Sequence, residues 1–350
     1  MNINVSNKLG KNLRTLSCLF ITLALTSSPI FAQTEWVDWS TAISSSEGGH
    51  AEGVLEIDKV IHQGIDITYD GEVLLSESPD YVLTTTNGAS KIWGPPQSFV
   101  SNEINIGPNE QNDAIFLKGV LPGENKITFK KPLLNPYIAI YSLGTYPGVT
   151  APVTLTFFST PSITSPLKVV AKGPANRLDG TCCQYNSHGL QDPIGNIITD
   201  DEGNGVVKFL GRISDISFTV DPSWDAGESF AFTVGVNIRD VSIDIKPGSD
   251  PNAINLKNMG NVPVAIMGSS ELDVATINQD TVNFAGAPEK MIRNGTSDVN
   301  GDGFPDIILH FLTQKLQLSQ TDTKACISGE LQSGELFQGC DTVKIVKINK

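Results

Sequence analysis

Ile65-Asp66-Ile67-Thr68-Tyr69 alternates apolar and polar side chains, and the run 54–57 before it has a similar pattern. Because successive side chains of a β-strand point to opposite faces of a sheet, the alternation predicts a strand with one buried and one solvated face. The two runs together predict the arms of a hairpin. Similar short runs recur between turn-forming residues, among 32 Gly and 20 Pro, and long amphipathic helical patterns are absent. The sequence therefore predicts an all-β protein.

The expected strands continue to the middle of the chain. They are 81–86, 114–117, 126–129, 137–142, 153–158, 167–171, 205–209, 213–220 and 229–236. About a dozen short strands with loops of varied length predict a jelly-roll-like β-sandwich. We expect this domain over 33–238, a joint at 239–244, and a smaller β-sandwich module over 239–350.

The first 32 residues predict a signal peptide. Lys8, Lys11 and Arg14 precede an apolar run at 16–25, and Ala32 is the expected cleavage point. That run is too short to span a bilayer, and the mature chain holds no apolar run of spanning length. Removing the leader leaves 21 Lys and Arg against 38 Asp and Glu, a balance of −17. We expect a secreted or cell-surface protein that does not bind nucleic acid, because phosphate binding needs concentrated positive charge.

Four cysteines remain after the leader. Cys326 and Cys340 flank a hairpin-like stretch that contains Gly329 and Gly334. Export favours disulfides, and a bridge there would close a loop of about 15 residues, worth roughly 3 kcal/mol in the chain-entropy model. Cys182 and Cys183 are adjacent, and their pairing is open, with packing or separate partners as the default.

The sharpest chemical signal is the loop 298–306, which reads DVNGDGFPD. Oxygen-bearing side chains at alternate positions, with a glycine where the chain turns, are typical of a Ca²⁺ loop. The loop departs from an EF-hand because Leu309 stands at the twelfth position and a strand follows. It resembles the Asp-rich loops of FG-GAP-type repeats. The expected ligands are Asp298, Asn300, Asp302, Asp306 and the Phe304 carbonyl; the alternative is an Asx-rich turn without an ion.

Two longer resemblances concern exported bacterial proteins. The phrases at 124–136, 137–144, 202–211, 213–219 and 232–235 resemble the N-terminal ectodomain of proteins that carry PEP-CTERM sorting tails. The phrases at 241–255, 262–268 and 298–311 resemble a C-terminal accessory β-module of exported bacterial proteins. The first resemblance implies a secreted β-domain, generally without assigned activity. The second implies an accessory module and not a catalytic unit.

Enzyme motifs are scarce in this sequence. It holds no nucleophile elbow, zinc-protease helix motif, P-loop or dinucleotide fingerprint. One cluster has residue types that a polysaccharide lyase could use to move a proton and neutralise a uronate carboxylate. Its members are Arg177, Gln184, Tyr185 and His188.

Aromatic side chains can also stack on sugar rings without any catalysis. The candidates are Trp39, Trp93, Trp224 and Tyr146, although aromatics at strand ends are more often part of a core. The sequence favours a non-catalytic binding or structural protein, directed at extracellular polysaccharide and stabilised by Ca²⁺. The alternative is an extracellular polysaccharide lyase, before a glycoside hydrolase, with the second module as its accessory.

Overall fold

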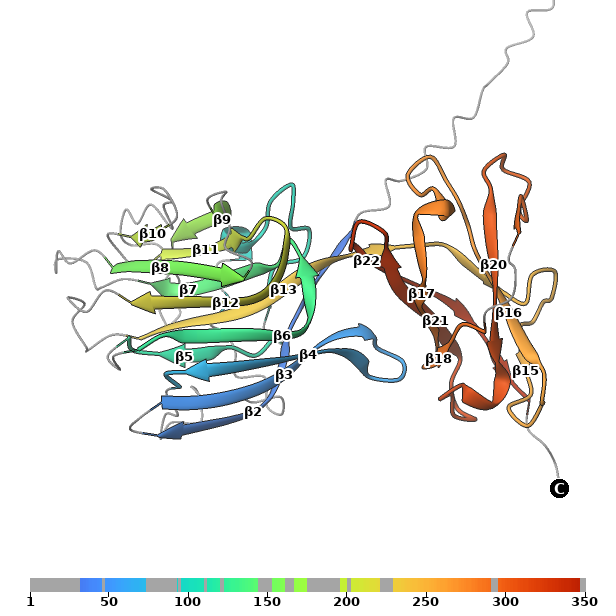
Figure 1. Cartoon of the computed structure of the whole chain (residues 1–350), viewed down its shortest axis with the longest axis horizontal. Coiled ribbons are helices and arrows are strands. Elements are labelled where there is room, and N and C mark those ends of the chain that lie inside the picture. Colours follow the sequence, from blue (N-terminus) through green and yellow to red (C-terminus); the bar gives the residue numbers. More distant parts are fainter. Residues whose placement is uncertain are drawn as a thin grey trace, which may run out of the picture.

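In the described parts of the 350-residue chain, the computed structural model (Figure 1) has regular secondary structure that is nearly all β-strand. It describes residues 32–45, 48–73, 93, 96–109, 112–119, 123–143, 153–160, 167–174, 196–199, 203–220, 229–290 and 295–346. The helical elements among these are 3-10 turns of three or four residues, and none is long and apolar enough to cross a membrane. The predicted all-β sandwich class is confirmed.

One layer of the first part of the chain is a seven-stranded antiparallel sheet. Its strand order is β10 (Asn196–Thr199), β8 (Val153–Thr160), β12 (Arg212–Val220), β6 (Asn125–Leu134), β4 (Gln63–Gly71), β3 (Gly48–Asp58) and β2 (Asp38–Ser45). β3 and β4 are the predicted hairpin, with Leu55 opposite Ile65. Ile67 and Tyr69 are fully buried, while Asp66 and Thr68 face outward. The apolar side chains of this stretch therefore face the core and its polar side chains face solvent, as the alternation in the sequence predicts.

The second layer belongs to a ten-stranded sheet that runs through the whole molecule. Its order is β18 (Ala287–Pro288), β17 (Ile277–Phe284), β21 (Lys324–Leu331), β22 (Leu336–Thr342), β13 (Phe230–Asp240), β7 (Tyr137–Leu143), β11 (Gly203–Lys208) and β9 (Lys168–Pro174), and β1 (Gln33–Trp36) and β5 (Ile115–Leu117) also pair with β13. The strands expected at 126–129 and 229–236 run further than the alternation indicated, to Leu134 and Asp240. The expected strand at 81–86 lies outside the described residues.

An apolar core lies between these two layers. Phe232 of β13 is at its centre, with its ring centroid 5.2 Å from that of Tyr69 and 5.6 Å from that of Phe218. Burying one such side chain contributes roughly 1.5–3 kcal/mol. A second cluster, which includes Trp93, Phe99 and Tyr141, covers the other face of β7 and β13. The ten-stranded sheet is therefore packed on both faces here, while the far face of the seven-stranded sheet carries polar side chains.

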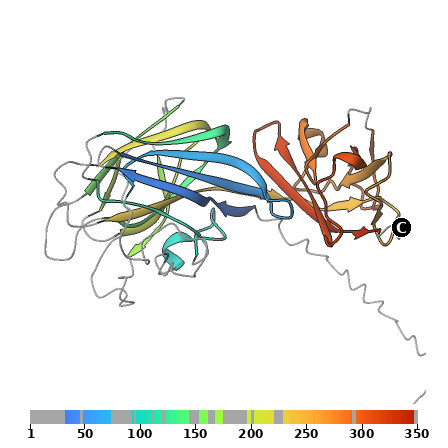
Figure 2. The same cartoon turned by 90° about the horizontal axis from the view of Figure 1, so that it is seen from below.

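The C-terminal part has its own core and two more sheets. The four-stranded sheet has the order β14 (Ile243–Ile245), β16 (Asn261–Ile266), β20 (Asp306–Leu312) and β19 (Thr296–Ser297), and β15 (Ala253–Ile254) pairs with β23 (Lys344–Ile345). Val264, Leu309 and Phe311 pack in this core against Phe284 and Phe337. Figure 2 shows the two parts as separate lobes.

β13 joins the two lobes. Its residue Ile238 belongs to the first core, and Val241, just after the strand, belongs to the second. The last residues of β13 pair in parallel with β22, so the sheet is continuous across the joint (Figure 1). The passage between the cores falls beside the predicted boundary at 238/239, and the division into two domains stays a prediction.

Candidate functional site

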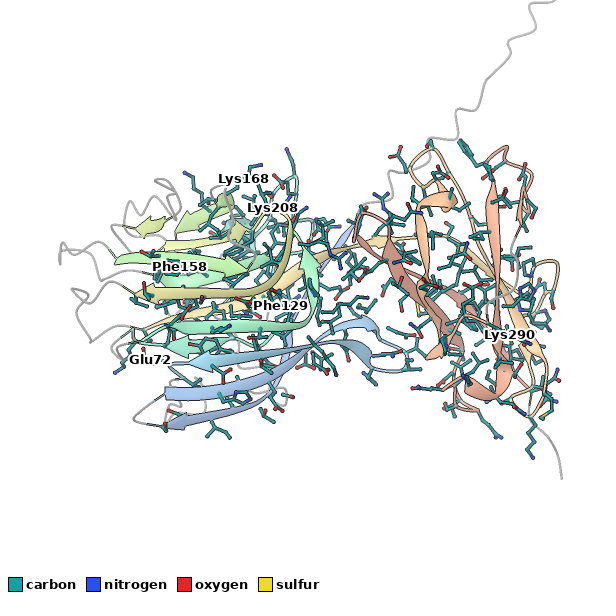
Figure 3. All side chains as sticks on the ribbon, viewed as in Figure 1. Glu72, Phe129, Phe158, Lys168, Lys208 and Lys290 are labelled. Atoms are coloured by element: carbon teal, nitrogen blue, oxygen red, sulfur yellow. A yellow bond between two sulfur atoms is a disulfide. The ribbon has the colours of Figure 1, made fainter. Side chains whose placement is uncertain are left out.

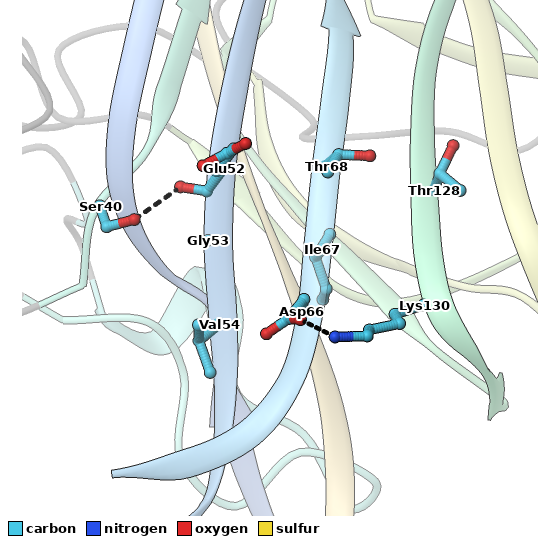
Figure 4. A pocket seen from close by; sticks show the side chains of 9 residues that line it. All are labelled: Ser40, Glu52, Gly53, Val54, Asp66, Ile67, Thr68, Thr128 and Lys130. Atoms are coloured by element: carbon cyan, nitrogen blue, oxygen red, sulfur yellow. Dashed lines mark hydrogen bonds and ion pairs between the residues drawn. The ribbon is translucent and has the colours of Figure 1, made fainter.

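The candidate site is an open groove on the outer face of the seven-stranded sheet (Figure 4). It encloses about 450 Å³. Four neighbouring strands, β2, β3, β4 and β6, supply its lining. The lining residues are Ser40, Glu52, Gly53, Val54, Asp66, Ile67, Thr68, Thr128 and Lys130. The groove is therefore built on regular strands and not on loops.

Strand register places the polar side chains in two rows. Glu52 is opposite Thr68, and Thr68 is opposite Thr128, which gives the first row. In the second row Val54 is opposite Asp66, and Lys130 lies across from Asp66 on the next strand (Figure 4). Directly opposite side chains on one face of an antiparallel pair have Cβ atoms about 5 Å apart. Carboxylate, hydroxyl and methyl groups therefore alternate over a short distance.

Several contacts fix these side chains. The Ser40 hydroxyl donates to the Glu52 carbonyl at 3.2 Å, and Lys130 forms an ion pair with Asp66. Glu52 and Asp66 stay accessible, with 61% and 53% of their side chains exposed. Hydrated carboxylates of this kind can accept hydrogen bonds from a ligand's hydroxyl groups.

His50 borders the groove on β3. Its Nδ1 lies 2.7 Å from Asp70 Oδ1, and its Nε2 lies 3.5 Å from Glu52 Oε1. The hydrogen bond to Asp70 is the main cause that raises the pKa of His50 above its usual 6.5; partial burial opposes it, and Glu52 adds to the rise. Protonation of His50 therefore adds a positive charge at the edge of the groove as the pH falls.

An exposed aromatic ring stands on the same sheet, two strands beyond β6. Phe158 of β8 is 53% exposed (Figure 3). It pairs with Ser217, which in turn pairs with Lys126 of β6. With strands roughly 4.8 Å apart, Phe158 lies roughly 10 Å from the groove's edge strand β6. An elongated ligand could reach both.

Two of the predicted ligand-binding aromatics are core residues, and for them the prediction is wrong. Trp39 is fully buried, and its Nε1 donates to the Thr233 hydroxyl at 3.2 Å. Trp93 is 4% exposed, and its Nε1 donates to the Asn112 carbonyl at 2.9 Å. Neither has a ring face available for a sugar. Trp224 and Tyr146 lie outside the described residues.

Other sequence predictions also fall outside the described residues. They concern residues 1–31 of the signal peptide, the possible lyase residues Arg177, Gln184, Tyr185 and His188, and the pair Cys182 and Cys183. The predicted bridge between Cys326 and Cys340 is present, and the two residues are opposite each other in the β21–β22 hairpin.

The loop 298–306 wraps tightly around one carboxylate. Asp298 Oδ1 accepts the backbone N–H of Gly301 at 2.7 Å and of Asp302 at 3.1 Å, and its Oδ2 accepts that of Gly303 at 3.0 Å. Gly301 and Gly303 have φ of 76° and 92°, values that favour glycine. The turn that the sequence predicted is therefore formed.

Asp306 holds this loop to the sheet. Its carboxylate is fully buried; Oδ1 accepts the N–H of Gly268 at 2.8 Å and Oδ2 that of Val299 at 2.7 Å. Within the described ranges, no group of three or more His, Cys, Asp and Glu side chains could hold a metal ion. That group of residue types leaves out the Asn300 amide oxygen and the backbone carbonyl oxygens, which Ca²⁺ sites also use as ligands. The donor chemistry fits a hard cation, and coordination by these residues stays a prediction.

The groove residues and Phe158 were not predicted as a site from the sequence. Alternation already placed Asp66 and Thr68 on the outer face. Their neighbours Thr128 and Lys130 lie about sixty residues further along the chain, so only the pairing of β4 with β6 brings them together.

Comparisons with known proteins give no family. No protein-family model and no curated protein matches the sequence. Among solved structures, the N-terminal domain of the Streptococcus gordonii adhesin Sgo0707 aligns with a TM-score of 0.26 and 8% identity, over 90% of this chain and 96% of that one. The adhesin domain of Epf from Streptococcus pyogenes aligns with a TM-score of 0.17 and 11% identity, over 91% and 93%. Scores this low carry no argument about fold or function.

Proposed function

We propose that the protein is an exported, non-catalytic binding protein that holds a polysaccharide in the groove across β2, β3, β4 and β6. The observation that carries the proposal is the row of Glu52, Thr68 and Thr128, beside the apolar side chain of Val54. A sugar ring presents both hydroxyl groups and apolar C–H surface. The lining offers hydrogen-bonding groups for the hydroxyls and an apolar side chain for the C–H surface.

The hydroxyl chemistry of the groove suits sugars. A threonine hydroxyl donates one hydrogen bond and accepts two, and a carboxylate accepts from several donors. Because the side chains stand on paired strands, little order has to be created on binding. Phe158, on the same sheet, adds an aromatic surface for a further ring.

The surroundings of the carboxylates favour binding over cleavage. A glycosidase pairs two carboxyl groups, one of them kept protonated by its environment. Glu52 and Asp66 are more than half exposed, and Asp66 already forms an ion pair with Lys130. A lyase needs groups that neutralise the substrate's carboxylate. The ammonium group that lines this groove belongs to Lys130, and its charge is already offset by Asp66.

The test removes one hydroxyl group at a time without changing side-chain shape. Thr68→Val and Thr128→Val should each weaken retention on a bound polysaccharide roughly threefold to tenfold, as expected for one lost hydrogen bond. Thr296→Val, an exposed strand threonine in the other lobe, is the matched control. The wild-type protein should release no reducing ends or unsaturated products. Equal retention of all three variants, or product formation, would contradict the proposal.

We also propose that the loop 298–306 binds Ca²⁺, with Asp298, Asn300, Asp302, Asp306 and the Phe304 carbonyl as candidate ligands. The ion would supply positive charge among these oxygens and tie the loop together. The support is the alternate spacing of the oxygen-bearing side chains, together with the formed turn, in which the backbone N–H groups of Gly301, Asp302 and Gly303 bind the Asp298 carboxylate. The role of such an ion is stabilisation, because the loop stands in the lobe that does not contain the groove.

A further inference from the structure

We propose that the groove selects neutral glycans over uronate-containing glycans through the charge of its lining. This inference rests on the proposed carbohydrate-binding function and names the ligand class for the same site. It depends on which charges line the groove and on which of them are already paired.

Acidic side chains outnumber basic ones on the outer face of the seven-stranded sheet. The acids on β3, β4 and β12 are Glu52, Glu56, Asp66, Asp70 and Asp215, and the bases on β3, β6 and β12 are His50, Lys126, Lys130 and Arg212. Each of the two lysines already faces an acid. Lys130 forms an ion pair with Asp66, and Lys126 lies 3.9 Å from Asp215. The positive charge of each ammonium is therefore already offset by a carboxylate of the protein, and neither leaves a net positive charge for a ligand's carboxylate.

Glu52 holds the least compensated charge in the groove. Among the described residues, its cationic neighbour is the His50 ring, at 3.5 Å. That ring lies closer to Asp70, at 2.7 Å. The Glu52 carboxylate therefore faces the groove with most of its acceptor capacity available. It suits a ligand that donates hydrogen bonds there and brings no negative charge.

A neutral sugar and its uronate counterpart differ at one position. The neutral sugar has a hydroxymethyl group, which can donate to Glu52 or Asp66. The uronate has a carboxylate, which cannot donate and is repelled by both. Exposed charges at this range are screened by water, so the expected penalty is modest, roughly threefold to tenfold in affinity at low salt.

The test uses pairs of oligosaccharides that differ in this group alone. The hexamers are gluco, galacto and manno pairs, each a neutral glycan and its uronan with the same linkage and anomeric configuration. Their binding is measured by calorimetry near neutral pH in about 20 mM and about 500 mM NaCl. In each pair that binds, the neutral member should bind roughly threefold to tenfold more tightly at low salt. The difference should shrink at high salt and in the double variant Glu52→Gln, Asp66→Asn. The control variant Asp280→Asn, which replaces an exposed acid in the other lobe, should leave the difference in affinity unchanged.

The two proposals fail in different ways. Equal or tighter binding of the uronate member, or a difference that persists in the double variant, overturns the charge selection and leaves carbohydrate binding in place. Absence of binding by every oligosaccharide overturns the proposed function, and the selection with it.

Discussion

Asp113 and Asp38 form a carboxyl pair where the chain passes from β1 to β2. Asp113 is buried and accepts the backbone N–H of Trp39. Burial first, and the neighbouring Asp38 second, raise the pKa of Asp113 from its ordinary 3.8 to about 7. The folded state therefore favours the protonated acid. The stability that the protonated Asp113 contributes is fully present below pH 3.8. It is lost as the pH rises from there to about 7.

Asp113→Asn should remove this pH dependence. The amide can still accept from Trp39 and can donate to Asp38 as the protonated acid does. Between about pH 4 and about pH 7, the melting temperature of the wild-type protein should fall relative to that of the variant, and above this range the difference should level off. Thermal unfolding at several pH values measures this. Parallel curves for the two proteins would mean that Asp113 is ionised throughout.

Calcium binding can be tested at the loop 298–306. Ca²⁺ at a hundredfold excess over its dissociation constant should stabilise the fold by about 2.7 kcal/mol and raise the melting temperature by several degrees. Asp302→Asn removes one charge from the candidate ligands and should reduce this Ca²⁺-dependent shift. Asp280→Asn serves as the control. If a chelator leaves the wild-type melting temperature unchanged, the loop is a turn without an ion.

The burial of Trp39 could not be predicted from the residues next to it in the sequence. Its neighbours Asp38 and Ser40 are polar and exposed, as they would be around a surface aromatic. The indole is buried because Phe232, nearly two hundred residues later, meets it edge to face at 6.5 Å. Alternation predicts that β2 has two faces. It does not identify the face that a second sheet covers.

At the scale of elements, the β21–β22 hairpin was predicted most completely. Gly329, Gly334 and the cysteine spacing indicated a closed hairpin, and the structure has Cys326 opposite Cys340 at a sequence separation of 14. These contacts are local, which is why sequence reasoning found them. The outer groove needs four strands from distant parts of the chain, and no local pattern specifies that order.

Removing this bridge should destabilise the protein without changing its fold. The double variant Cys326→Ser, Cys340→Ser should lower the free energy of unfolding by roughly 3 kcal/mol, the value expected for a loop of this length. Urea denaturation measures the difference. The reduced wild-type protein is the control and should match the variant. Equal midpoints for oxidised and reduced protein would show that the bridge adds no stability.

Across the whole molecule, charged contacts reinforce the joint between the lobes. Glu330 of β21 is 4% exposed; it lies 2.6 Å from Lys131 Nζ and 3.6 Å from Arg212 Nη1, both on the other lobe. Arg239 donates through Nε and Nη2 to Glu335 at 3.0 and 3.1 Å. Together with the β13–β22 pairing, these contacts should couple the lobes in unfolding.

A double-mutant cycle tests this coupling. Glu330→Gln and Lys131→Met should show an interaction energy of about 1–2 kcal/mol, reduced from that of a fully buried pair because Lys131 is partly exposed. The pair Lys126 and Asp215, 3.9 Å apart on the sheet surface, is the control and should give below about 0.5 kcal/mol. Equal energies for the two pairs would mean that Glu330 does not bridge the lobes.

The division into two domains stays a prediction, and the sequence did not predict how the two parts of the chain are joined. The passage between the two cores, at Ile238 and Val241, falls beside the predicted boundary at 238/239. The parallel pairing of Ile238 with Leu336 connects residues almost a hundred positions apart. Such contacts depend on the complete fold, and so does the groove.

A polysaccharide is proposed to bind across β2, β3, β4 and β6. Side-chain footprinting of the full chain with and without a bound oligosaccharide tests it most directly. Bound oligosaccharide should protect Glu52, Asp66, Thr128 and Lys130, and should protect no side chain in the lobe formed by 241–345. Protection confined to that lobe, or an unchanged pattern at the groove while the oligosaccharide is bound, would contradict it.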